Sequence, residues 1–306
     1  MRVVLVGEEA AGLRVMREIL DAGHELVAVL TSAPRGGRPL PALWHQAQAL
    51  GLPVLPPARV ADAAFLDLVL AERAELLLNV HSLVVLPEAV LDAPRQGCFN
   101  LHPGPLPEYA GLNTVSWAIY HGERDYGVTL HRMSPRIDAG EIASLARFDI
   151  GDRDTALSVY AKCLTFGLPL VAKLLRDAAE GSLQLTPQDL RRRRYFGRGV
   201  PENGRISWQK PARQIHDFVR ACDYAPFPSP WGHPLAMVRD RTFAIARSEL
   251  AGPGAPAAPG TVGEVDATGA LVACGDGWLR LRRLLVEGRP ALPTTLLRQG
   301  DVLRTP

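Results

Sequence analysis

The chain has few residues that could cross-link or anchor it. Its 306 residues include only four cysteines, Cys98, Cys163, Cys222 and Cys274, and a chain of this length can build its core without disulfides. Their wide spacing predicts buried, reduced thiols and does not suit a zinc site. No apolar run approaches the roughly 18 residues of a membrane span, and residues 1–12 lack a signal-peptide pattern. We therefore expect a cytoplasmic protein with no membrane partner.

Motifs for several common reactions are also missing. Gly7 and Gly12 follow an apolar run, but no Lys and Ser/Thr complete a phosphate-binding loop, and G-x-G-x-x-G does not occur. Ser82, Ser116 and Ser134 lack the G-x-S-x-G context of a serine hydrolase. There is no H-E-x-x-H, so no metal is expected. The net charge of +2 does not by itself indicate a nucleic-acid partner.

Apolar runs alternate with helix-like segments through the first 190 residues. The expected strands are 3–6, 25–31, 53–55, 76–80, 98–102 and 128–133, and the expected helices are 8–22, 41–51, 61–73, 88–93, 114–121 and 155–180. This alternation predicts an α/β fold, a doubly wound Rossmann-like domain with a mostly parallel sheet. Ligands bind at the carboxyl ends of the strands in such sheets, so we expect the loops after residues 80, 101 and 133 to meet there.

The pattern changes after residue 190. A basic run, RRRRYFGR, occupies residues 191–198, and we interpret residues 191–205 as a linker between a domain at 1–190 and a smaller one at 206–306. The second domain shows one helix and then short strands, which predicts a small β-barrel. The basic run suits a solvated linker; the alternative is a contact for an anionic acceptor such as a nucleotide diphosphate, a phosphopantetheine arm or tRNA.

The segment FNLHPGPLPEYAG, residues 99–111, ends one predicted strand. Asn100 and His102 are two residues apart, so in a strand they face the same way. An amide donor beside a titratable imidazole suits acyl chemistry, although such a pair can also serve only to satisfy loop backbone groups. A second segment, GVTLHRMSPRIDAGEI, runs from a predicted strand into a loop that holds Asp138, which could complete a three-residue site.

These motifs resemble a known family. N-x-H-P, LPEYAG, WAIYHGE, GVTLHRM and IDAGEI occur in the order and spacing of the formyltransferases that use 10-formyltetrahydrofolate. GRISWQKPARQIHDFVRAC and PGTVGEV match, less specifically, the OB-like C-terminal domain of that family. The resemblance implies an N-formyltransferase with 10-formyltetrahydrofolate as co-substrate, no metal, and Asn100, His102 and Asp138 as catalytic residues.

The resemblance also implies roles for the surrounding loops. Residues expected to bind the folate are Ser82, Leu83, Val84, Val85, Leu86, Pro87, Arg136, Ile137, Ala139 and Gly140. Residues expected to bind the acceptor are Pro103, Gly104, Pro105, Leu106, Tyr109 and Gly111. For Leu83 and Val85, packing in the core is an equal alternative, and His81 and His131 suit supporting roles better than catalytic ones.

Each catalytic residue has an expected task. Asn100 would donate a hydrogen bond to the formyl oxygen as negative charge develops there. His102 would accept the proton of the attacking amine. Asp138 would orient His102, and it could relay a proton to the folate nitrogen if burial raised its pKa.

The acceptor is the least determined part. The tRNA-acting members of the family carry a longer basic loop after the second strand and a W-R-G element, whereas this chain has only Arg35 and Arg38 in the loop and Glu108, Tyr109 and Ala110 at the element. A small-molecule amine is therefore expected: a nucleotide-linked amino sugar, an amino acid, or an aminoacyl group on a carrier protein. The alternatives are a methionyl-tRNA formyltransferase, and a 10-formyltetrahydrofolate hydrolase or folate-binding module. The oligomeric state is not predicted.

Overall fold

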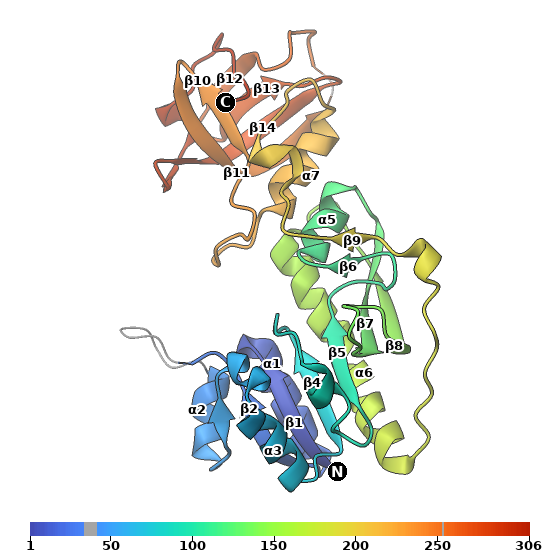
Figure 1. Cartoon of the computed structure of the whole chain (residues 1–306). Coiled ribbons are helices and arrows are strands. Elements are labelled where there is room, and N and C mark those ends of the chain that lie inside the picture. Colours follow the sequence, from blue (N-terminus) through green and yellow to red (C-terminus); the bar gives the residue numbers. More distant parts are fainter. Residues whose placement is uncertain (34–41, 253) are drawn as a thin grey trace. The chain divides into compact units, whose positions relative to one another are not determined.

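The computed structural model describes residues 1–33, 42–252 and 254–306 (Figure 1). Arg35 and Arg38, the two basic residues after the second strand, lie outside the described residues. The chain forms two compact units: residues 1–111, 125–148 and 161–195 make the first, and residues 112–124, 149–160 and 196–306 make the second. The boundaries inferred from the sequence, at residues 190 and 205, remain a prediction.

The first unit is built on a seven-stranded sheet. Its strands are β1 (Arg2–Gly7), β2 (Glu25–Leu30), β3 (Val54–Leu55), β4 (Leu76–Val80), β5 (Cys98–His102), β7 (Asp125–Arg132) and β8 (Ile142–Asp149). They lie in the order β3-β2-β1-β4-β5-β7-β8. The pairs from β3 to β5 are parallel, and β5 with β7 is antiparallel. The sheet confirms the predicted Rossmann-like, mostly parallel architecture, and its order reverses between β1 and β4, where such sheets bind ligands.

Helices connect these strands (Figure 1). They are α1 (Glu9–Asp21), α2 (Ala42–Ala49), α3 (Ala63–Ala71) and α4 (Glu88–Leu91), and α6 (Ala156–Glu180) follows the last strand, β8. In α1 the buried residues Ala11, Val15, Met16 and Ile19 recur at helical spacing, so one face packs on the sheet while the other stays polar. The buried strands supply the rest of the core, for example Val3, Leu5, Leu76 and Leu78.

The long helix α6 packs closely against β5. A Cβ on Gly167 would lie 2.9 Å from Leu101 Cδ2, so glycine allows the helix to approach this strand. By length and composition alone α6 could cross a membrane, and it is the one such helix among the described residues. Buried core helices pass the same test, and Val171 and Leu175 of α6 are fully buried. We therefore assign α6 to the core.

Two features of this sheet differ from expectation. The strand β8 was not predicted, because its residues are mostly half-buried and show no clear alternation. The loop after residue 133 was expected at the carboxyl ends of the strands. It instead leaves β7 beside the opposite end of β5, where Met133 N donates to Cys98 O (2.7 Å), because β7 is antiparallel. This loop then returns along the sheet, and that return brings Asp138 to His102.

The second unit is an antiparallel sheet with helices. Its strands are β10 (Leu235–Val238), β11 (Arg241–Gly252), β12 (Val262–Asp266), β13 (Gly269–Ala273), β14 (Trp278–Val286) and β15 (Arg289–Ala291). The order is β10-β11-β14-β13-β12, with β15 on β14. The helices are α5 (Thr114–Tyr120) and α7 (Ala212–Ala221), and α7 packs on α5 and β11. The short strands β6 (Ala110–Gly111) and β9 (Tyr195–Phe196) lie where the chain passes between the units.

The two edges of this sheet are joined by the last residues of the chain. Arg304 exchanges two backbone hydrogen bonds of 2.9 Å with Met237 on the β10 edge. On the β12 edge, Val262 N donates to Asp301 O (2.8 Å) and Leu303 N donates to Gly260 O (2.8 Å). Residues 301–304 therefore close the sheet in the manner of a small barrel, in agreement with the C-terminal domain expected from the sequence.

Candidate active site

A row of polar side chains crosses three neighbouring strands. The register pairs Asn79 of β4 with Asn100 of β5, and Asn100 with His131 of β7. Asn79 Nδ2 donates to Asn100 Oδ1 (3.1 Å) and to the backbone oxygen of Ser82 (3.1 Å). On the other side Asn100 Nδ2 lies 3.2 Å from His131 Nε2. The Asn100 amide is thus held from both sides, in one orientation.

His131 is set up to accept from Asn100. Its Nδ1 lies 2.8 Å from the backbone oxygen of Arg132, and a carbonyl can only accept, so Nδ1 carries the proton. A neutral ring therefore accepts from the Asn100 amide at Nε2, whereas a protonated ring donates from Nε2 to the Asp138 carboxylate. The same Nε2 also lies 3.4 Å from Asp138 Oδ1. The structure therefore places His131 in direct contact with two of the three predicted catalytic residues, closer to the site than the sequence indicated.

His102 is buried at the end of β5 and contacts two groups. Its Nε2 lies 2.6 Å from the backbone oxygen of Tyr109, so Nε2 is the donor. Its Nδ1 lies 3.6 Å from Asp138 Oδ2. Gly104 makes this arrangement possible, because a Cβ there would lie 2.7 Å from Tyr109 O and 2.9 Å from His102 Nε2. The residue type at 104 is thus dictated by the position of the imidazole.

Asp138 is held by its own loop as well as by the histidines. Its Oδ2 accepts from Gly111 N (2.8 Å), and Gln188 Nε2 donates to the backbone oxygens of Asp138 (3.2 Å) and Gly140 (2.6 Å). The backbone of Asp138 has φ +52°, in the left-handed region that non-glycine residues avoid. Strained backbone of this kind is concentrated at functional sites.

The electrostatics of Asp138 and His102 favour an ionised aspartate and a neutral histidine. Burial alone would raise the pKa of Asp138, but His102, His131 and the Gly111 N–H together outweigh it and hold the pKa below its usual range. Burial lowers the pKa of His102, and the Asp138 carboxylate only partly opposes that shift. The condition for a proton relay by Asp138, a pKa raised by burial, is therefore not met, because the net shift has the opposite sign.

The predicted folate residues divide into two groups. In the loop after β4, Leu83 is 84% exposed and Val85 is 65% exposed, whereas Leu86 is buried and Val84 packs against the core. Core packing is thereby excluded for Leu83 and Val85, and the loop presents two apolar side chains to its surroundings. Ser82 and Pro87 are half-buried, and their contact with folate stays a prediction. In the other loop Arg136 and Ile137 are exposed, while Ala139 and Gly140 are half-buried.

The predicted acceptor residues form a supported turn. Gly104, Pro105, Leu106 and Tyr109 are buried, while Pro103 and Gly111 are half-buried. The turn is held by two β7 residues that sequence reasoning passed over. Thr129 Oγ1 donates to Gly104 O (2.7 Å) and accepts from Leu106 N (3.0 Å), and Tyr126 Oη donates to Pro103 O (2.9 Å). Acceptor binding by these six residues stays a prediction.

Asn79 and Thr129 could have been found from the sequence. Each is a polar residue between apolar neighbours of a strand, in LLLNV and GVTLHR, and buried polar groups in strands need partners. His81, directly after β4, also has an unusual backbone, with φ +57°. Burial lowers its pKa to about 4. No group of three or more His, Cys, Asp or Glu residues that could hold a metal ion occurs in the part of the chain that the structure describes.

Comparison with known proteins identifies the family. Residues 3–173 match the formyl transferase family and residues 200–301 match the formyl transferase C-terminal domain. The chain belongs to the formyl transferase family, and it is a formyltransferase.

Its relatives extend over the full length. A methionyl-tRNA formyltransferase of Methylobacterium nodulans is 33% identical over 99% of this chain and 96% of its own. One of Sorangium cellulosum is 34% identical over 99% and 98%.

Among solved structures, the N-formyltransferase of Helicobacter canadensis in complex with folinic acid and dTDP-3-aminofucose has a TM-score of 0.67 at 21% identity, covering 92% of this chain and 98% of its own. WlaRD, a sugar 3N-formyl transferase, has a TM-score of 0.70 at 18% identity, covering 92% and 97%. At these identities the likeness is one of fold.

Proposed function

We propose that this chain transfers the formyl group of 10-formyltetrahydrofolate to a primary amine, with Asn100, His102 and Asp138 as its catalytic residues. The observation that carries the proposal is the convergence of these three side chains: His102 Nδ1 faces Asp138 Oδ2 at 3.6 Å, and His131 connects Asp138 to Asn100. An oriented amide beside a buried imidazole and carboxylate supplies a donor, a base and a counter-ion for acyl transfer.

The reaction follows from the proton positions. A bond forms between the amine nitrogen and the formyl carbon, and the bond from that carbon to the folate nitrogen breaks. Negative charge on the formyl oxygen is met by the N–H of Asn100, whose amide is held in one orientation. The amine proton passes to His102 Nδ1, because Nε2 already donates to Tyr109 O. Asp138 then faces the imidazolium, and this cation can return the proton to the departing folate nitrogen.

Substitution of each residue tests the assignment. Asn100→Ala removes one donor to the oxyanion and is expected to lower turnover about 100-fold to 1000-fold. His102→Ala and Asp138→Ala should also reduce transfer severely, while 10-formyltetrahydrofolate binding, followed by calorimetry, stays near that of the wild type. Near-normal turnover in any variant would remove that residue from the mechanism. Release of formate without an amine would instead support the hydrolase alternative.

The relatives support methionyl-tRNA as the acceptor. The Methylobacterium nodulans and Sorangium cellulosum proteins share about a third of their residues with this chain over nearly its whole length, and both carry the name methionyl-tRNA formyltransferase. That support outweighs the differences between this chain and the tRNA-acting members in the loop after the second strand and in the W-R-G element. We therefore propose methionyl-tRNA as the first candidate acceptor and keep a small-molecule amine as the second candidate.

One observation favours the second candidate. Three arginines of the basic run already have partners within the chain. Arg192 pairs with Glu108, and Arg191 Nε donates to Asp189 Oδ1 at 2.8 Å. The Arg194 guanidinium lies 4.8 Å from the centre of the Tyr109 ring. Arginines engaged in this way offer less charge to a phosphate backbone.

A direct comparison of acceptors decides between them. Purified protein is given 10-formyltetrahydrofolate with either methionyl-tRNA or a panel of free amino acids, amino-sugar nucleotides and carrier-bound aminoacyl groups, and products are identified by mass spectrometry. A value of kcat/KM for methionyl-tRNA far above that for every other amine is expected. The reverse order would establish the small-molecule acceptor, and the Glu108→Lys variant, which replaces an acidic residue of this element with a basic one, should then gain activity on tRNA.

A further inference from the structure

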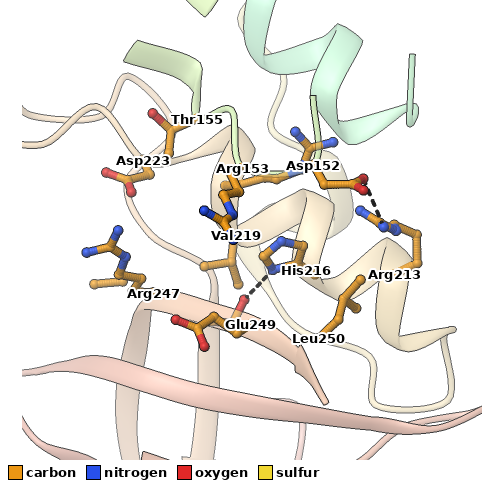
Figure 2. A pocket seen from close by; sticks show the side chains of 13 residues that line it. Asp152, Arg153, Thr155, Arg213, His216, Val219, Asp223, Arg247, Glu249 and Leu250 are labelled. Atoms are coloured by element: carbon orange, nitrogen blue, oxygen red, sulfur yellow. Dashed lines mark hydrogen bonds and ion pairs between the residues drawn. The ribbon is translucent and has the colours of Figure 1, made fainter. Parts of the chain in front are cut away.

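The second unit contains a cavity of about 520 Å³ that is lined by none of the formyl-transfer residues. Figure 2 shows its walls. One wall is the face of α7 with Arg213, His216, Val219 and Arg220. The other walls are residues 246–250 of β11 and the segment that holds Asp152, Arg153 and Thr155. Asp223, which follows α7 in the chain, completes the lining. All these residues belong to the second unit, so the cavity is complete within it.

Four arginines line this cavity, and two of them form no ion pair with the described residues. Arg153 and Arg247 are exposed side chains that also make no hydrogen bond within the part of the chain that the structure describes. In Figure 2 Arg247 lies near Asp223, and Arg153 lies between Asp152 and Val219. An arginine guanidinium presents several N–H donors in a plane, a shape that suits phosphate and carboxylate oxygens.

A third arginine is built into the wall. Arg220 is 4% exposed. Its Nε donates to Asp217 Oδ1 (2.7 Å), and its Nη1 donates to the backbone oxygens of Asp154 (2.9 Å) and Gly151 (3.3 Å). Its Nη2 is buried and has no hydrogen-bond partner among the described residues. Arg220 therefore supplies a buried positive charge in the wall, while Arg153 and Arg247 supply the guanidinium groups that a ligand can reach.

Acidic residues also line the cavity, but two of the three already have cationic partners. Asp152 pairs with Arg213 (3.0 Å) and Arg124 (2.5 Å), and Glu249 pairs with Arg282 (2.5 Å). Asp223 Oδ1 accepts from the backbone N–H of Ala225 (3.1 Å). The arginines that remain available therefore outnumber the available carboxylates. His216, whose Nδ1 lies 3.0 Å from Ser248 Oγ, adds a further polar group.

The size of the cavity limits the ligand. A volume of about 520 Å³ lies within the range of small-molecule sites, and it exceeds the space that an inorganic anion needs. Val219, Ala246 and Leu250 give the same cavity an apolar part. We propose that this cavity binds a small organic phosphate, with its phosphate on Arg153 and Arg247 and its organic part against the apolar residues.

The cavity is lined by none of the formyl-transfer residues, so a measurement of ligand binding tests the proposal without any measurement of formyl transfer. The whole protein is titrated by calorimetry with adenosine monophosphate, with adenosine and with inorganic phosphate. Adenosine monophosphate should bind more tightly than either fragment, and its affinity should fall as salt is raised. Absence of measurable binding by adenosine monophosphate would overturn the proposal. Equal binding of inorganic phosphate would overturn the assignment of the organic part.

Matched variants locate the binding. Arg153→Gln and Arg247→Gln remove exposed charges that have no ion-pair partner among the described residues, so folding should be unaffected, and each should weaken binding about ten-fold. Arg241→Gln is the control, because Arg241 is exposed on the same strand β11 and does not line the cavity. Wild-type affinity in the double variant Arg153→Gln and Arg247→Gln would exclude this cavity. A strong preference for tRNA over the nucleotide would show that the arginines contact a nucleic-acid backbone instead.

Discussion

Asn100 and His131 face each other across two antiparallel strands, with Asn100 Nδ2 3.2 Å from His131 Nε2. Asn79 holds the opposite end of the same amide at 3.1 Å. The proposed oxyanion donor is therefore oriented by its neighbours before any substrate binds. Preorganised donors of this kind contribute more to catalysis than donors that must rotate into place.

This relationship predicts that His131 acts as a positioning residue. His131→Ala should lower kcat about ten-fold, because the Asn100 amide loses one partner and Asp138 loses a neighbour, while the KM for 10-formyltetrahydrofolate changes little. His131→Gln, whose amide oxygen can also accept from Asn100, should recover much of the loss. Steady-state kinetics of both variants checks this. An unchanged kcat in the alanine variant, or no difference between the two, would contradict the role.

A substitution at Gly104 tests whether catalysis depends on the position of the His102 imidazole. Gly104→Ala places a methyl group 2.7 Å from Tyr109 O and 2.9 Å from His102 Nε2, so the hydrogen bond that fixes His102 must lengthen. We expect kcat to fall by about 100-fold, the typical cost of a 1 Å displacement of a catalytic group. Gly197→Ala is the control, because a Cβ at Gly197 meets no atom within 4 Å. Similar activity in the two variants would mean that His102 tolerates displacement.

The pH dependence of transfer follows from the lowered pKa of His102. A base must be neutral, so kcat/KM should rise with pH along a limb that lies below the ordinary value of about 6.5. Asp138 raises the pKa of His102 within the folded protein. Asp138→Asn should therefore move the limb to still lower pH, in addition to reducing the rate. The pH profiles of the wild type and of Asp138→Asn are measured with the same acceptor, so that the titration of the acceptor amine affects both equally. A shift of the Asp138→Asn limb to higher pH would contradict the assignment of His102 as the base.

Stability should also depend on pH through His81. Burial lowers its folded pKa to about 4, whereas an unfolded histidine titrates near about 6.5. Between these values the unfolded chain binds a proton that the folded chain does not, so the free energy of unfolding falls as the pH falls through this window. His81→Asn should reduce that loss, because Asn tolerates the φ of +57° and does not titrate.

Urea unfolding at pH 7 and pH 5 measures the difference. His45→Asn, on the exposed side of α2, serves as the control. The wild type should lose more stability than His81→Asn over this interval. Equal losses would show that His81 does not titrate as the structure indicates.

Local patterns predicted much of the fold and of the site. The strand from Cys98 to His102 and the shared face of Asn100 and His102 follow from period-two geometry, and the structure agrees. The direction of β7 does not follow, because the connection from His102 to Asp125 is long enough for either parallel or antiparallel pairing. That direction decides that His131 lies opposite Asn100 and that the following loop must turn back.

The ionisation state of Asp138 does not follow from the sequence either. A carboxyl group in an apolar pocket and one beside two imidazoles shift in opposite directions. The balance depends on the distances of 3.6 Å to His102 and 3.4 Å to His131, which come from the return of the loop. In the same way, the apolar pattern SLVVLP suits a buried segment or an exposed one, and only the tertiary structure shows Leu83 and Val85 on the surface.

The exposure of Leu83 and Val85 has a thermodynamic consequence. Two large apolar side chains, 84% and 65% exposed, order the water around them as long as the loop is uncovered. A flat ring system laid over this loop would release that water, and the binding of folate should therefore carry a negative heat-capacity change. Alanine at both positions should make this change smaller even where affinity is little altered. The temperature dependence of the binding enthalpy thus reports whether the folate covers this loop.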